Sequence, residues 1–213
     1  MGFAPGQCVE ETKHAHPVTL KRQGRVCTLI LNGELYNAKE LGRELKADTD
    51  RNEKLFLLAY MQYGPEFVQK INGVFGAVIW DETKKILFLF RDRIGANPMF
   101  YTQKKETLFF ASAIGSLFQY PGVDPVLDEN GLCEIFALGP ARTPGNGVFR
   151  DIYEVLPGHY LSFADGILKD HCYWNVKSQP HEDSREETVE KTAWLLEDSI
   201  KRQMESEETI STF

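Results

Sequence analysis

The chain has 213 residues, of which 42% are hydrophobic, 12% aromatic and 26% charged, a balance typical of a globular protein. This composition excludes collagen, a coiled coil and a disordered chain. The formal charge of −7 argues against nucleic acid or an anionic membrane as a partner, because both need a basic protein face.

The acidity is concentrated near the C-terminus. Residues 181–213 hold ten acidic and four basic residues, whereas residues 1–180 hold 21 acidic and 20 basic ones. A shift of this kind indicates a boundary between two parts of the chain.

The cysteines indicate a reducing compartment. Cys8, Cys27, Cys133 and Cys172 lie far apart, without a C-x-x-C pair or a preceding signal peptide, so we expect free thiols and a cytoplasmic protein. Apart from Cys8, they are expected to pack as small hydrophobic residues. No apolar run approaches the roughly 20 residues that cross a bilayer, so no membrane partner is expected.

The first predicted strand leads into a turn. Residues 26–31 are apolar and rich in β-formers, and Asn32-Gly33-Glu34 follows them. We therefore expect a buried strand over residues 26–31 and a turn at residues 32–34.

Helices are predicted after this turn. Their ranges are residues 38–46 with Asn37 as N-cap, residues 53–63, and a short helix over residues 65–71. The second helix is apolar all round, which suits a helix covered on most sides.

The middle of the chain predicts short antiparallel strands. They span residues 74–80, 86–90, 99–102 and 108–111. Because the connections between them are short, we expect a meander that forms the middle layer, and a parallel Rossmann sheet is disfavoured.

The rest of the domain predicts one helix and a closing hairpin. The helix spans residues 129–138, a loop rich in Pro and Gly follows over residues 139–151, and the hairpin joins residues 160–163 to 167–174.

A last helix is expected from Glu186 onward. One apolar stripe runs along it, formed by Val189, Ala193, Leu196, Ile200 and Met204. Such a stripe needs a surface to pack against, and we expect its partner to lie outside this chain.

Several motifs in one order resemble a known family. They are Leu-Asn-Gly-Glu-Leu-Tyr-Asn at residues 31–37, Asn-Gly-Val-Phe-Gly-Ala-Val-Ile-Trp-Asp at 72–81, Arg-Asp-Arg-Ile-Gly at 91–95, and Leu-Pro-Gly-His-Tyr at 156–160. Together these motifs resemble glutamine-hydrolysing asparagine synthetase, and the resemblance runs from about residue 26 onward.

The resemblance implies an α+β fold, an αββα sandwich of antiparallel sheets like that of the N-terminal-nucleophile hydrolases. By this comparison the domain lacks its first strands, and a C-terminal helix belongs to a second domain. The implied divisions are a class II glutamine amidotransferase-like domain over residues 1–174, a linker over residues 175–185, and the start of the synthetase domain over residues 186–213, ending before its pyrophosphate loop.

In this family, one domain hydrolyses glutamine to glutamate and ammonia. The other domain adenylates aspartate with ATP and magnesium, and ammonia from an internal tunnel then displaces AMP. The implied partners are therefore glutamine as ligand, and a synthetase-domain polypeptide or a second copy of this chain. No cofactor is expected in this chain itself, while ATP and Mg belong to the complete family enzyme.

The family's nucleophile is a cysteine at the mature N-terminus, whose own α-amine can manage the proton. Gly2 stands near the start of this sequence, and Cys8 is the nearest cysteine. Because an internal cysteine has no α-amine, we expect no nucleophile and a chain that alone is catalytically silent.

By the same resemblance, Asn32 and Gly33 form the oxyanion hole, in which the Asn amide and the Gly N–H donate to the developing oxyanion. The alternative is a plain Asn-Gly turn. Glu34 would hold the glutamine ammonium, or else be a solvated turn acid. Asn52 falls where the family has an ammonium-binding aspartate, and this removes a charge from the site.

Other positions also differ from the family pattern. Pro5 falls where an arginine grips the substrate carboxylate, and Asn97 stands where a lysine is usual. The alternating charges of Arg91, Asp92 and Arg93 predict a structural ion-pair element rather than a phosphate clamp. The five histidines show no metal-binding spacing, so no metal is expected.

Alternative interpretations remain open. The chain could be a non-catalytic glutamine-binding or partner-docking module, or half of a split asparagine synthetase. A branch that makes glucosamine phosphate or phosphoribosylamine is disfavoured by the Arg-Asp-Arg and Leu-Pro-Gly-His-Tyr motifs.

Overall fold

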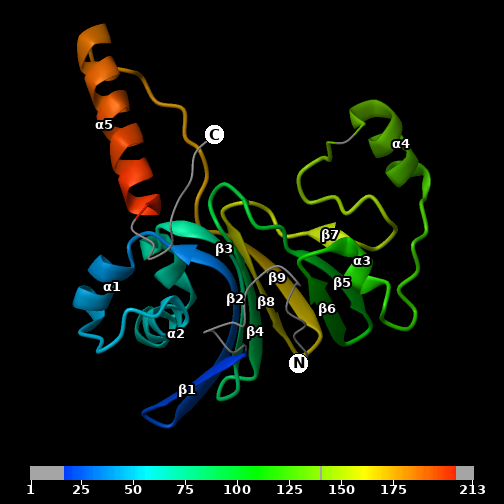
Figure 1. The fold of residues 1–213 in the computed structure, drawn as a ribbon. Helices are drawn as coiled ribbons and strands as arrows, with labels where there is room; N and C mark the ends of the chain where they lie inside the picture. The colour runs from blue at the N-terminus through cyan, green and yellow to red at the C-terminus, as the bar shows by residue number, and fades with distance from the viewer. Residues whose placement is uncertain (1–16, 140, 205–213) are drawn as a thin grey trace.

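The computed structural model describes residues 17–139 and 141–204. In this part of the chain the strands form two antiparallel sheets (Figure 1). The larger sheet contains, in spatial order, β1 (Val18–Arg22), β2 (Arg25–Leu35), β3 (Gly73–Asp81), β4 (Ile86–Arg91), β8 (His159–Ala164) and β9 (Ile167–Cys172). The smaller sheet contains β6 (Thr107–Ala111), β5 (Phe100–Lys104) and β7 (Tyr153–Glu154).

Helices flank the two sheets. They are α1 (Ala38–Leu45), α2 (Asn52–Tyr63), the 3-10 helix η1 (Pro65–Lys70), α3 (Ile114–Leu117), α4 (Glu129–Leu138) and α5 (Arg185–Gln203). In Figure 1, α1 and α2 cover one face of the larger sheet, and the smaller sheet lies on its other side.

Three apolar cores hold these layers together. The largest lies between the larger sheet and the helices α1 and α2, where Phe56 contacts Phe67 edge-on with ring centroids 4.7 Å apart. A second core, which includes Leu89 and Met99, lies between the sheets. A third, around Leu117, lies beyond the smaller sheet. The expected α+β fold with antiparallel sheets is therefore confirmed, whereas the expectation of missing first strands stays a prediction.

The expected turn at residues 32–34 is wrong, because β2 continues through these residues to Leu35. Asn32 lies opposite Gly76 and Gly33 opposite Phe75 on β3. Pairing with β3 therefore keeps this segment extended, where local turn propensity alone favoured a break.

The expected single meander is also wrong. Strands β3 and β4 lie in the larger sheet, whereas β5 and β6 lie in the smaller one. The short strands β1 and β7 and the one-turn helix α3 were not predicted, because each is too short to show a clear hydrophobic period.

The expected helix after Asn37 forms, but its first turn is not capped by the Asn37 side chain. That side chain instead donates to the Lys70 carbonyl at 2.9 Å and accepts from the Asn72 N–H at 2.9 Å. Asn37 therefore joins the start of α1 to the chain segment that enters β3.

Helix α5 begins with a capping box formed by Ser184 and Glu187. None of its residues is buried, and Leu196 is 63% exposed. Arg202 near its end pairs with Glu40 of α1 at 2.9 Å. The structure thus contains the helix and the uncovered apolar stripe that the sequence predicts. The domain limits at residues 174 and 185 stay predictions.

In the described ranges, no helix is long and apolar enough to cross a membrane.

A buried carboxylate joins α2 to the larger sheet. Asp81 is fully buried, accepts from the Tyr60 hydroxyl at 2.8 Å, and pairs with Arg25 at 3.0 Å. Burial by itself raises the pKa of Asp81. The hydrogen bonds from the Lys84 N–H, Tyr60 and Arg25 together lower it by more, so the pKa of Asp81 lies below its ordinary value of 3.8.

We expect Asp81→Asn to lower the free energy of unfolding by about 2 kcal/mol at neutral pH, because the substitution removes the charge from a buried hydrogen-bonded pair. A lowered folded-state pKa stabilises the protein above the unfolded-state pKa, and this stabilisation is lost as the pH falls through the folded-state value. The difference between the two proteins should therefore shrink below about pH 4.

Urea unfolding at neutral and acidic pH measures this effect. Asp183→Asn is the matched control, since Asp183 pairs with Lys191 at 2.7 Å on the surface and the loss of a surface ion pair changes stability little. If Asp81→Asn and Asp183→Asn lower the free energy of unfolding equally, Asp81 does not stabilise the fold as described.

Candidate functional site

The Asn32–Gly33 pair lies near the end of β2, where the backbone of β3 approaches closely. Gly33 has a φ of +139°, and a Cβ at this position would lie 2.0 Å from the Val74 carbonyl oxygen and 2.7 Å from the Phe75 Cα. Only glycine fits here, because both neighbours are backbone atoms that cannot rotate away. The interpretation as a plain Asn-Gly turn is therefore excluded.

A loop after β4 packs against this pair. The Asn97 side-chain amide donates to the Asn32 carbonyl at 3.1 Å. The loop itself is held by the buried carboxylate of Asp92, which accepts from the Gly95 N–H at 2.7 Å and the Phe75 N–H at 3.2 Å. One carboxylate thus fixes both the loop and the strand that face Asn32.

The neighbouring arginines are structural, as the sequence predicts, but they do not pair with Asp92. Arg91 is buried, donates to the Val155 carbonyl at 2.6 Å, and pairs with Glu154 at 3.1 Å. Because Glu154 lies on β7, this ion pair joins the two sheets. Arg93 donates to a carbonyl of η1.

Glu34 follows Gly33 on β2, opposite Val74, and its side chain is exposed. Burial raises the pKa of the nearby Tyr36 hydroxyl, and the negative charges of Glu34 and Asp92 raise it further. Two carboxylates therefore lie near the end of β2, and a carboxylate suits a ligand ammonium.

Asn52 is separate from the other candidates. It is the half-buried first residue of α2. No hydrogen bond links it to Asn32, Gly33 or Glu34 in the ranges that the structure describes. The structure thus brings together three of the four predicted residues as neighbours on one strand and places the fourth at a helix N-terminus.

The cysteines differ in their surroundings. Burial and the charge of Asp81 raise the pKa of the Cys27 thiol to about 11, so Cys27 stays protonated and agrees with the expected packing role. Cys133 and Cys172 are exposed, so the same expectation is wrong for them. Cys8 lies outside the described residues, as does Pro5.

Sequence reasoning noted Asn97 only as a departure from the family pattern. Its contact with Asn32 joins residues 65 positions apart, and no periodicity or local motif signals such a contact. For metal binding, the described ranges contain no group of three His, Cys, Asp or Glu side chains that could hold an ion.

Comparison with known proteins places the chain among amidotransferases. A family model described as a glutamine amidotransferase domain matches residues 8–174. Two similar proteins are asparagine synthetases [glutamine-hydrolyzing] 3 and 2 of Bacillus subtilis. The first is 38% identical and the match covers 92% of this chain and 33% of that protein; the second is 31% identical, with 91% and 28% covered.

The chain thus spans about a third of the length of these relatives. Among solved structures, glutamine phosphoribosylpyrophosphate amidotransferase of B. subtilis, in complex with ADP and GMP, has a TM-score of 0.51 at 16% identity, covering 76% of this chain and 32% of that chain. This likeness supports the fold that the sheets define. On the match over residues 8–174, the chain belongs to the glutamine amidotransferase domain family and is related to the glutamine-hydrolysing asparagine synthetases.

Proposed function

We propose that this chain is the glutamine-binding part of a glutamine-hydrolysing asparagine synthetase. The observation that carries the proposal is the backbone at Gly33, which lies in a paired strand and accepts no side chain. This close approach fixes the Gly33 backbone against β3, and a fixed backbone N–H is the kind of donor that an oxyanion hole uses.

In this proposal the Asn32 amide and the Gly33 N–H stabilise the oxyanion that forms when a nucleophile adds to the glutamine amide carbon. Such donors are effective when they are fixed before the reaction. Pairing with β3 and the hydrogen bond from Asn97 both restrain Asn32. These contacts fix the backbone of the Asn32–Gly33 pair, which supports the assignment of the Gly33 N–H as a donor.

Glu34 is proposed to hold the ammonium group of glutamine. Its carboxylate is exposed, and with Asp92 it supplies the negative charge that raises the pKa of Tyr36 beyond the effect of burial. Asn52 is proposed as a weaker second contact, because a neutral amide forms about half as strong a bond to an ammonium as a carboxylate does. We therefore expect weak glutamine binding.

The partner in this proposal is a synthetase-domain polypeptide that packs against α5. The exposed stripe on α5, with Leu196 and Ile200, supports it. ATP and Mg would be bound by that second part, and no described residue of this chain is assigned to them. A second copy of the chain and a non-catalytic docking role are alternative interpretations of the same helix.

Asn52→Asp should tighten glutamine binding by about fivefold, because it places a charge opposite the ligand ammonium. Titration calorimetry of the 213-residue chain with glutamine measures the change.

Asn130→Asp is the matched control, since Asn130 is an exposed residue in the first turn of α4. Both substitutions add an acid near a helix N-terminus, where it stabilises the helix by about 0.5 kcal/mol, but only Asn52→Asp should change the affinity. An unchanged affinity would remove Asn52 from the site.

The 213-residue polypeptide should release no glutamate from glutamine, because the thiolate that attacks the amide needs an activating base and Cys8 has no α-amine of its own. A coupled glutamate assay tests this. Turnover at an ordinary amidotransferase rate that disappears in Cys8→Ala would contradict the prediction.

Leu196→Asp should abolish association with the synthetase part of the B. subtilis relative that is 38% identical, because a charge cannot be buried in an apolar interface without a partner. Analytical ultracentrifugation of the mixture measures association. Glu190→Asp on the same helix is the control. If the unsubstituted chain, Leu196→Asp and Glu190→Asp all associate equally with the synthetase part, α5 is not the docking surface.

A further inference from the structure

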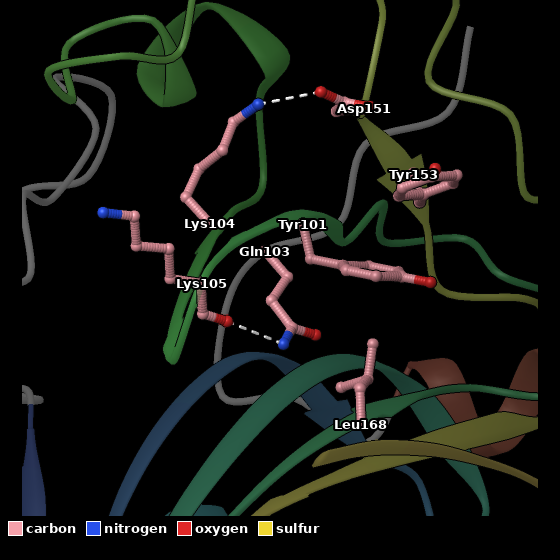
Figure 2. A pocket seen from close by; sticks show the side chains of 7 residues that line it. All are labelled: Tyr101, Gln103, Lys104, Lys105, Asp151, Tyr153 and Leu168. Carbon is pink, nitrogen blue, oxygen red and sulfur yellow. Dashed lines mark hydrogen bonds and ion pairs between the residues drawn. The ribbon is translucent and has the colours of Figure 1, made fainter. Parts of the chain in front are cut away.

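A surface pocket of about 580 Å³ lies between the two sheets. It is lined by Tyr101, Gln103, Lys104, Lys105, Asp151, Tyr153 and Leu168 (Figure 2). Strand register places it near the start of β4, whereas the Asn32–Gly33 pair lies near the end of β4. The pocket is therefore separate from the proposed glutamine site.

One wall of the pocket is aromatic. The rings of Tyr101 and Tyr153 lie 5.6 Å apart between centroids, and Tyr153 is 48% exposed. The Leu168 side chain points toward the Tyr101 ring (Figure 2). Partly exposed tyrosine rings beside an aliphatic side chain form a surface onto which a planar aromatic group can pack.

The opposite side of the pocket is cationic. Lys104 is held by Asp151, with Nζ and Oδ2 2.8 Å apart (Figure 2). An ammonium has three N–H donors, so two remain available to a ligand. Lys105 also lines the pocket, but its ammonium points away from the tyrosine rings (Figure 2). The cationic group on this side of the pocket is therefore the Lys104 ammonium.

The pocket also bridges the two sheets. The Gln103 amide donates to the Lys105 carbonyl at 2.9 Å and to the Gly166 carbonyl at 2.8 Å. These bonds join the β5–β6 turn of one sheet to the β8–β9 turn of the other. A ligand in contact with both Lys104 and Leu168 would therefore hold the sheets together and stabilise the fold.

We propose that this pocket binds a small aryl anion, an aromatic ring that carries a carboxylate or phosphate group. The ring packs against Tyr153 and Leu168, and the anionic oxygens accept hydrogen bonds from Lys104. A bare anion uses only the cationic side and a neutral ring only the aromatic side, so both bind more weakly.

Phenyl phosphate is the first probe, with benzoate, phenol and inorganic phosphate beside it. Titration of the full chain, followed by the amide NMR shifts of Gln103 and Tyr153, should show saturable binding of phenyl phosphate or benzoate. Phenol and inorganic phosphate should bind at least about fivefold more weakly. The bound aryl anion should also raise the melting temperature. Absence of saturation, or equal affinity for phenol, would overturn the proposal.

Lys104→Gln should weaken phenyl phosphate binding about threefold, because the exposed ion pair between the Lys104 ammonium and the ligand phosphate is lost. Lys70→Gln is the matched control: Lys70 pairs with Glu44 at 2.7 Å and lies 4.8 Å from the Tyr63 ring centroid, outside the pocket. Equal weakening by both substitutions would show non-specific charge attraction and overturn the site. Asn52→Asp should leave the affinity unchanged, so this test is independent of the glutamine proposal.

Discussion

Two adjacent charged residues at the end of β4 join the two sheets and fix the loop that follows. Arg91 of the larger sheet forms an ion pair with Glu154 of the smaller one. The Asp92 carboxylate accepts hydrogen bonds from backbone N–H groups of its own loop and from Phe75 of β3. Loss of these contacts would leave a buried charge without a partner, which is costly. Arg91 and Asp92 therefore join the sheets and fix the loop against β3, and this loop carries Asn97 to its contact with Asn32.

This constraint separates the rigid part of the proposed site from its variable part. The backbone around Gly33 is fixed by neighbours that are themselves backbone or buried charge, so its geometry is insensitive to surface substitutions. In the proposed glutamine site, the ligand ammonium is assigned to Glu34 and Asn52, which are exposed and half-buried side chains outside the core. Substitution of these side chains would leave the backbone around Gly33 in place.

The sequence predicts most of the helices and hairpins, because α2, α4 and α5 have clear apolar patterns or end signals. It predicts the wrong conformation at Asn32–Gly33, since a local Asn-Gly signal favours a turn, whereas pairing with β3 decides the outcome. Motif resemblance found the candidate residues on β2. The contact from Asn97 and the assignment of strands to two sheets depend on long-range packing, which local patterns do not encode.

The contact between α5 and α1 has a consequence for the position of this helix. Helix α5 buries none of its residues, and the Arg202–Glu40 ion pair that joins it to α1 is solvent-exposed. Such a pair contributes little to stability and is screened by salt. The contact between α5 and α1 therefore weakens as the ionic strength rises, and the position of α5 depends on salt more than that of any buried element.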